Sequence, residues 1–164
     1  MKLLMLRKIS RLGSWNVRTL YQTGKLKEVA RDFNACKLDI LEIRETRWTG
    51  NGRATLDTGE TMLCSDEEDA NYTEGVGLIL SRQPTRFLLG WQPEGPSIVS
   101  AMFKTNKKKI NLRVINCYAP TIEKGEDVKE RLYARRQGVQ ENSKSKDITI
   151  LMGDFNAQIG NDNT

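Results

Sequence analysis

The chain has 164 residues, 38% hydrophobic and 29% charged, which suits one globular domain with its own core. Lysine and arginine exceed aspartate and glutamate by 26 to 21, and the net charge of +5 is compatible with a polyanionic partner. Histidine is absent, which excludes a Ser-His-Asp triad, a Cys-His pair, a histidine-ligated zinc and a histidine general base within these residues. Carboxylate chemistry with a hard metal ion remains.

The cysteines and the first residues give expectations about compartment. Cys36, Cys64 and Cys117 are far apart and show no CxxC spacing, so we expect neither a disulfide-linked partner nor a zinc site. The N-terminus lacks a signal-peptide core, and no stretch has the length of a membrane span. We therefore expect an intracellular monomer, nuclear or cytoplasmic, with residues 1–9 as an extension and residues 10–164 as one domain.

Residues 9–46 predict a strand, a helix and a second strand. The first strand, ISRLGSWNV, ends near Asn16. The helix, residues 25–38, has Leu26, Val29, Ala30 and Phe33 on one side. The second strand, DILEIRET, ends at Glu45, and this succession is typical of a βαβ unit.

Two charged residues, Glu42 and Arg44, lie inside the second of these strands with a spacing of two. Charges on one face are unusual for a strand that is covered on both sides. Either they pair with neighbouring residues, or they mark a copy of the sequence that has drifted.

The middle of the chain predicts a turn, a short strand and then strands alone. Residues 49–52 form the turn and residues 60–65 the strand; for the acidic run Asp66 to Asp69 that follows, we prefer a solvated loop to a metal site. Strands with turn signals between them, one at Gln83-Pro84, then predict an antiparallel meander over residues 75–82, 86–91, 98–105 and 109–119. The lysines at 104, 107, 108 and 109 suit a charged hairpin tip, with a phosphate contact as the alternative.

The last third predicts a helix over residues 126–138 and a strand in the stretch DITILMGDFNAQIG, residues 147–160. Ile148, Ile150 and Leu151 fit a buried strand that Gly153 breaks. Asp154 and Asn156 would then project into the crevice where α/β folds bind ligands. The alternative is an ordinary Asx-type turn.

Polar residues thus gather at the carboxyl ends of separate strands. A carboxylate such as Glu45 is a good Mg²⁺ ligand, because this ion prefers oxygen ligands and keeps waters that a substrate phosphate can displace. Asp154 could orient or deprotonate a water, and neutral groups could donate hydrogen bonds to a phosphate oxygen. Phosphodiester hydrolysis suits this set, which comprises Asn16, Glu45, Tyr118, Asp154 and Asn156.

The motifs SWNVRTL, RETRWTG, GVGLIL, CYAPT and MGDFNAQIG, in this order, resemble the endonuclease/exonuclease/phosphatase superfamily, above all the apurinic/apyrimidinic-type endonuclease domain of non-LTR retrotransposons and the related craniofacial development protein family. The resemblance implies an α/β fold, a DNase I-like four-layer α/β/β/α sandwich of two sheets. It implies a Mg²⁺-dependent DNA endonuclease, with Mn²⁺ as a possible substitute.

The same resemblance implies a role for each candidate residue. Asn16 and Glu45 correspond to the metal-site pair, Tyr118 to a phosphate-contacting tyrosine, Asp154 to the acid that activates water, and Asn156 to its companion at the phosphate. Arg18, Lys107 and Lys108 are candidate nucleic-acid contacts.

The chain also departs from the family. It has neither the further site Asp nor the Asp-His pair of the family's second half; Ser97 stands where relatives often carry Arg, and Glu42 with Arg44 replace small or neutral residues. We expect a domain that is incomplete at its C-terminus and cleaves DNA slowly by itself. The alternatives are a non-catalytic nucleic-acid-binding remnant, and a superfamily phosphatase or phosphodiesterase with another substrate.

Overall fold

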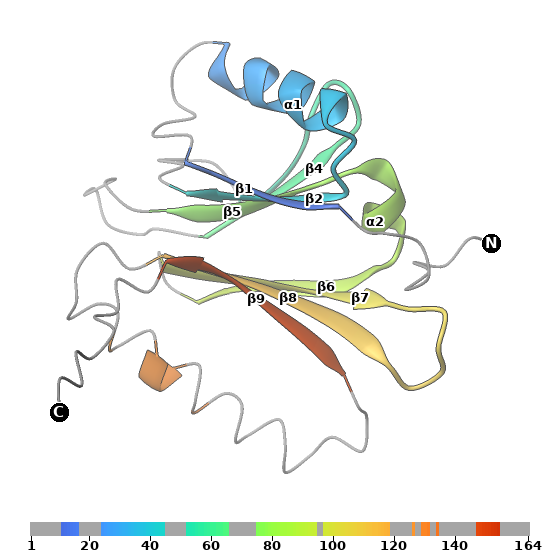
Figure 1. The fold of residues 1–164 in the computed structure, drawn as a ribbon, viewed down its shortest axis with the longest axis vertical. Helices are drawn as coiled ribbons and strands as arrows, with labels where there is room; N and C mark the ends of the chain where they lie inside the picture. The colour runs from blue at the N-terminus through green and yellow to red at the C-terminus, as the bar shows by residue number, and fades with distance from the viewer. Residues whose placement is uncertain are drawn as a thin grey trace, which may run out of the picture.

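The structure is a computed structural model, and it describes residues 11–16, 24–44, 52–65, 75–94, 97–118 and 147–154, with single positions between 126 and 134. These residues form two β-sheets that lie face to face, with a helix above the first sheet (Figure 1). The two-sheet α/β fold expected from the motifs is therefore confirmed.

The first sheet is five-stranded, with the order β1-β2-β5-β4-β3. Its first two strands are parallel and all its other pairs are antiparallel. Helix α1, Lys25–Ala35, connects the parallel strands, so the predicted βαβ unit is confirmed. The strands are β1 (Leu12–Asn16), β2 (Ile40–Arg44), β3 (Arg53–Thr55), β4 (Thr61–Cys64) and β5 (Val76–Leu80).

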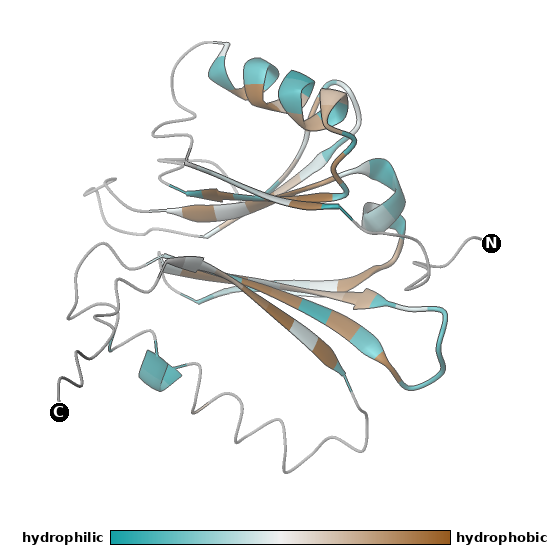
Figure 2. Ribbon diagram, in the orientation of Figure 1, coloured by the Kyte–Doolittle hydropathy of each residue, from teal (hydrophilic) through white to brown (hydrophobic). Residues whose placement is uncertain are grey.

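Helix α1 covers the outer face of the first sheet (Figure 1). Its apolar side follows the predicted stripe, since Val29, Ala30 and Phe33 are buried and Leu26 packs against the same cluster. Figure 2 shows hydrophilic residues on the remaining surface of this helix. Burial of this stripe, rather than helix propensity alone, stabilises the helix.

The second sheet is four-stranded, with the order β6-β7-β8-β9. The first three strands form an antiparallel meander, and the last strand joins parallel to β8. The strands are β6 (Leu88–Glu94), β7 (Ile98–Lys104), β8 (Asn111–Tyr118) and β9 (Ile148–Asp154).

The main core lies between the two sheets, where alternate residues of their facing strands meet. Buried apolar side chains from β2, β4 and β5 pack there against side chains from β7 and β8. Partly buried residues of β1, β6 and β9 complete this layer, so helix α1, the first sheet and the second sheet form successive layers.

Two predictions about the middle of the chain were wrong, and one strand was not predicted. The strand expected at residues 75–82 is β5, which lies between β2 and β4 in the first sheet and not in the meander. The turn expected at Gln83-Pro84 is helix α2, Arg82–Arg86, where Pro84 is tolerated because the first helical turn leaves its N–H groups without helical acceptors. Strand β3 was not predicted; it is only three residues long.

The prediction for β9 was wrong in two respects. Gly153 does not end the strand, which continues to Asp154. The strand is also not fully buried, because Ile148 is 40% and Leu151 49% exposed. β9 has a partner strand on one side only within the described parts of the chain, and this leaves its apolar residues less covered than those of β5.

Several predicted features fall outside the described residues: Arg18, Glu45, Asn156, the acidic run Asp66 to Asp69 and most of the helix expected at residues 126–138. Where helices are described, none combines the length and the apolar character that crossing a lipid bilayer requires.

Candidate active site at the strand ends

Each sheet contains one parallel strand pair whose carboxyl ends lie side by side. In the first sheet Asn16 pairs with Arg44, the residue before Glu45. In the second sheet Tyr118 pairs with Asp154. Parallel strands end at the same edge of a sheet, so the second sheet brings Tyr118 and Asp154 together, and the first sheet brings Asn16 beside the residue that precedes Glu45.

A buried amide joins the two sheets close to these ends. Asn116, two residues before Tyr118, is 0% exposed. Its Nδ2 donates to the carbonyl oxygen of Ile43 at 3.1 Å and to that of Gly77 at 2.9 Å. Because Ile43 lies two residues before Glu45, the strand ends of both sheets meet at one end of the sandwich (Figure 1, left side).

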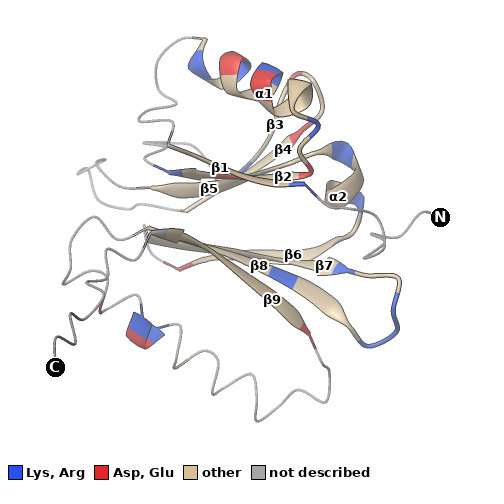
Figure 3. Cartoon of the chain, viewed as in Figure 1, with Lys and Arg blue, Asp and Glu red and all other residues tan. Residues whose placement is uncertain are grey.

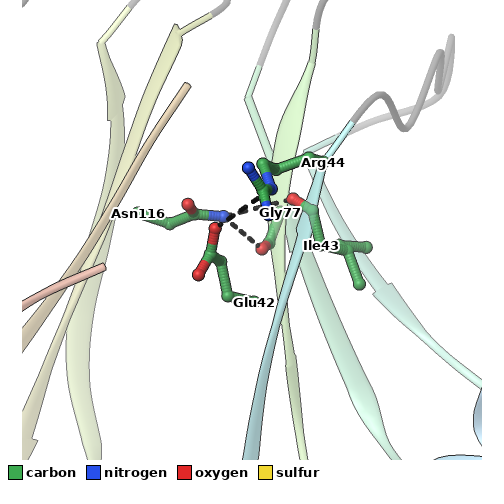
Figure 4. A network of polar contacts seen from close by, with 5 residues as sticks. All are labelled: Glu42, Ile43, Arg44, Gly77 and Asn116. Carbon is green, nitrogen blue, oxygen red and sulfur yellow. Dashed lines mark hydrogen bonds and ion pairs between the residues drawn. The ribbon is translucent and has the colours of Figure 1, made fainter. Parts of the chain in front are cut away.

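The charged residues inside β2 form an ion pair with each other (Figure 4). Arg44 Nε lies 3.6 Å from Glu42 Oε1, and Glu42 is 2% exposed. In Figure 4 the Glu42 and Asn116 side chains point toward one another between the sheets. Glu42 is buried and Arg44 is partly exposed, so loss of Arg44 would remove a positive charge beside a buried carboxylate and destabilise the fold.

Glycine at position 153 lets β9 reach its register with β8. Gly153 has φ +128°, and an added Cβ would clash with the carbonyl oxygen of Cys117. Only glycine adopts this backbone without strain and without a clash. The residue expected to break the strand instead carries it one residue further, to Asp154 opposite Tyr118.

The predicted site residues are described to different extents. Tyr118 is half-buried and packs against the core between the sheets. For Asn16 and Asp154 the structure gives the backbone register only, and Glu45 and Asn156 lie outside the described residues. The convergence of the strand ends is therefore observed, while the arrangement of the functional groups themselves stays a prediction.

The donor types at these ends match a hard metal ion. Within the described parts of the chain, no group of three or more His, Cys, Asp or Glu residues could hold a metal. The candidate ligands Asn16 and Glu45 carry oxygen atoms, and Mg²⁺ takes oxygen ligands with several retained waters. A site with few protein ligands fits that preference.

The candidate nucleic-acid contacts Lys107 and Lys108 lie elsewhere. They occupy the turn between β7 and β8, where Figure 3 shows a cluster of basic residues. Strand β8 runs from Asn111 beside this turn to Tyr118, which is roughly 23 Å at about 3.3 Å per residue. These lysines and Tyr118 cannot contact the same phosphate group.

The buried thiols are poor nucleophiles. Loss of solvation raises the pKa of Cys64 to about 12. The pKa of Cys117 also rises to about 12, first through burial and then through the negative charges of Glu42 and Glu94. Both cysteines are free, as is the exposed Cys36. A thiolate mechanism at neutral pH is disfavoured at both buried positions.

Asn116 was not identified from the sequence. The signal was present: the spacing of two places Asn116 on the same face of β8 as Leu112 and Val114, which face the other sheet. An amide in such a position requires a hydrogen-bond partner. Its partners are main-chain carbonyl groups, which sequence patterns do not specify.

Comparison with known proteins supports the resemblance. No family model matches the chain. It is 32% identical over 149 residues to craniofacial development protein 2 of Bos taurus, and 31% identical over 149 residues to that of Tragulus javanicus. These alignments cover 91% of the chain but 24% and 25% of the two relatives. The chain thus spans about a quarter of the length of the curated relatives it matches.

Solved structures share the fold at low sequence identity. The endonuclease domain of TRAS1, a telomere-specific non-LTR retrotransposon, matches with TM-score 0.57 and 16% identity over 92% of the chain and 60% of that domain. AP endonuclease LMAP from Leishmania major matches with TM-score 0.57 and 16% identity over 86% of the chain and 53% of that protein. An endonuclease/exonuclease/phosphatase family protein from Leptotrichia buccalis gives TM-score 0.56 and 15% identity, over 91% and 67% of the two chains. The chain therefore has the fold of the endonuclease/exonuclease/phosphatase family, and its sequence is similar to craniofacial development protein 2.

Proposed function

We propose that the strand ends of the two sheets form part of a Mg²⁺-dependent site for phosphodiester hydrolysis in DNA. The observation that carries the proposal is the convergence of two parallel strand pairs, one from each sheet, at one end of the sandwich. The shared fold with the TRAS1 endonuclease domain and with AP endonuclease LMAP supports the reaction class.

The candidate residues divide the chemistry between the sheets. Asn16 and Glu45 would hold Mg²⁺, which when bound supplies positive charge to the scissile phosphate and its leaving oxygen. Tyr118 and Asn156 donate hydrogen bonds to phosphate oxygens. Asp154 accepts a proton from the water that attacks phosphorus as the bond to the leaving oxygen breaks.

Turnover by these residues alone is slow in this proposal. The Asp-His pair implied by the resemblance is not available, because the chain contains no histidine. Loss of one donor to a transition-state oxyanion typically costs about 2.7–4 kcal/mol, on the order of 10²–10³ in rate. Groups that act as a unit do not lose their effects independently.

Metal binding tests the first-sheet half of the site. Calorimetric titration with Mn²⁺ or Mg²⁺ is expected to show weak binding that Glu45→Gln weakens further, because one carboxylate with neutral helpers makes a poor cage. A matched control is Glu67→Gln in the acidic run. Equal affinity in wild type and Glu45→Gln, with a loss in Glu67→Gln, would place the ion at the acidic run.

A nicking assay on supercoiled plasmid with Mg²⁺ tests turnover. We expect no useful rate from the 164-residue chain. Clear nicking that Asp154→Asn abolishes would show that the missing groups are not required. Nicking that persists in Asp154→Asn would instead remove Asp154 from the mechanism.

A second candidate function is nucleic-acid binding without turnover. The basic turn between β7 and β8 favours it, since Lys107, Lys108 and Lys109 are exposed and lie away from the strand ends (Figure 3). Lysines at phosphates release counterions, so binding would weaken steeply with salt and show little sequence preference.

Charge reversal at this turn tests whether its lysines contact DNA phosphates. The double substitution Lys107→Glu and Lys108→Glu is expected to reduce the salt dependence of DNA affinity. The charge-matched pair Lys25→Glu and Lys27→Glu on α1 provides the control. An affinity that does not change between low and moderate salt would exclude this mode of binding.

A further inference from the structure

One side chain ties the two sheets together beneath the candidate site. The two N–H groups of the Asn116 amide go to separate acceptors, at 3.1 Å on Ile43 and 2.9 Å on Gly77. Ile43 and Gly77 are opposite each other in β2 and β5, so a single planar group from β8 contacts two strands of the first sheet. Figure 4 shows both hydrogen bonds.

The hydrogen bonds of Asn116 are made by its nitrogen. The side chain is 0% exposed, and its Oδ1 has no hydrogen-bond partner among the described residues. A buried oxygen without a hydrogen-bond partner is destabilising, so Asn116 accepts a cost at Oδ1 while its Nδ2 makes both hydrogen bonds. Neither aspartate nor leucine, which have a similar size, could donate both bonds.

The position of this tie relates it to the strand ends. Asn116 lies two residues before Tyr118 in β8, and Ile43 lies two residues before Glu45. Along β8, Asn116 and Tyr118 are thus about 6.6 Å apart. The apolar core holds the two sheets together but does not favour one alignment of the sheets, because the hydrophobic effect is non-directional. Hydrogen bonds are directional and fix a particular alignment.

We propose that Asn116 is a positioning residue that aligns the metal side of the site on the first sheet with the phosphate side on the second. The residues named for the two sides rest on the proposed function, and the alignment rests on the two hydrogen bonds. Asn116 touches neither ligand in this role. It acts through the main chain that leads to Glu45 and Tyr118.

Thermodynamic coupling tests the alignment without turnover. If a metal ion and a DNA phosphate share one site, each raises the affinity for the other by the same factor, typically 5- to 150-fold. The Kd of Mn²⁺ is measured with and without a saturating duplex that carries hydrolysis-resistant phosphorothioate linkages. Wild type is expected to show a coupling factor of about 10.

Asn116→Leu is expected to separate the two sides. It should leave the Kd of Mn²⁺ alone within about twofold, because that site lies on the first sheet, and lower the coupling factor toward one. Asn111→Leu, at the opposite end of the same strand, is the matched control and should keep the wild-type coupling. A purely structural loss would lower stability but leave the coupling of the folded protein intact.

A second variant tests the hydrogen bonds themselves. Asn116→Asp keeps the shape but places a carboxylate against two carbonyl oxygens, near the ion pair of Glu42 and Arg44. The folded-state pKa of the new carboxyl is then raised, so its destabilisation is present at neutral pH and is relieved as pH falls. The unfolding free energy of this variant, relative to wild type, is expected to recover between pH 7 and pH 5.

The outcomes are distinguishable. Coupling that survives in Asn116→Leu overturns the positioning role alone. Absence of coupling in wild type overturns the proposed function together with this role. A stability difference between Asn116→Asp and wild type that does not change with pH overturns the tie between the sheets.

Discussion

The two parallel strand pairs hold their ends together in different ways. In the first sheet, β2 is buried from Ile40 to Ile43, with helix α1 on one face and the second sheet on the other. In the second sheet, β9 leaves Ile148 and Leu151 exposed and comes into register through the close approach of Gly153 to β8.

This difference suggests that different residues determine the stability of the fold and the alignment of the strand ends. In the first pair, β2 has a core on both faces, so its position follows from burial. The second pair depends on a backbone conformation at Gly153, and Asn116 relates it to the first. We expect core substitutions near α1 to destabilise the whole fold, and changes near β9 to disturb the candidate site more than the fold.

The largest effect is expected at the helix-covered face. Phe33 is fully buried between α1 and the first sheet, and Phe33→Ala should lower the unfolding free energy by about 3–5 kcal/mol. Urea unfolding measures the change, with the exposed Arg31→Ala on the same helix as control. A loss below about 1 kcal/mol would mean that the helix contributes little to the core.

A smaller loss of unfolding free energy, with the disturbance concentrated in β9, is expected at Gly153. Gly153→Ala adds backbone strain of about 1–3 kcal/mol and a clash with the carbonyl oxygen of Cys117. The matched control is Gly90→Ala, where an added Cβ meets nothing within 4 Å. Hydrogen exchange should show lost protection in β9 first. Protection of β9 that equals wild type would contradict the close approach.

A pH-dependent effect is expected at Glu60. Burial alone raises the pKa of this carboxyl, but hydrogen bonds from Thr58 and Asn34, with the positive charge of Arg82, lower it overall. Asn34 Nδ2 lies 2.7 Å from Glu60 Oε1. A lowered folded-state pKa gives stability that is present above the unfolded pKa and lost as pH falls through the folded one.

Glu60→Gln removes this contribution. The unfolding free energy of wild type should therefore fall more steeply on acidification below about pH 5 than that of Glu60→Gln. Equal slopes in the two proteins would show that the hydrogen bonds do not stabilise the charged form.

The smallest effect on stability is expected at the exposed side of β9. Leu151 is 49% exposed, and Leu151→Thr should change the unfolding free energy by no more than about 0.5 kcal/mol. Solubility should increase, because exposed apolar edge strands promote aggregation. Leu78→Thr, at a fully buried position of β5, is the comparison and should be far more costly. Equal losses would mean that β9 is covered in solution.

Local patterns predicted much of this fold. The apolar stripe around Phe33 identified α1. Runs of β-branched, aromatic and other apolar residues before Asn16 and Glu45 identified β1 and β2. Patterns failed where pairing partners decide the outcome: β5 has the composition of a meander strand, but it pairs with β2 and β4. The left-handed backbone of Gly153 likewise depends on β8, which lies far from it in sequence.

The sequence predicted candidate residues at the strand ends, but it did not predict the buried polar contacts beneath them. Strand-end reasoning found Tyr118 and Asp154, which the structure places in register. It missed Asn116, whose acceptors are main-chain atoms, and it left open how Glu42 and Arg44 are accommodated between the sheets. It placed Lys107 and Lys108 at a hairpin tip before the strand that leads to Tyr118, and in the structure they occupy the turn before β8.

The most direct test of a shared site is paramagnetic broadening by Mn²⁺, because a bound Mn²⁺ ion broadens the amide resonances that lie close to it. Mn²⁺ bound at Glu45 should broaden the amide signals of Tyr118 and Gly153, while those of Lys107 and Lys108, at the far end of β8, stay sharp. Glu45→Gln should remove the broadening. Two results would contradict a single site formed by both sheets. In one, wild type binds Mn²⁺ but the signals of Tyr118 and Gly153 stay sharp; in the other, the broadening persists in Glu45→Gln.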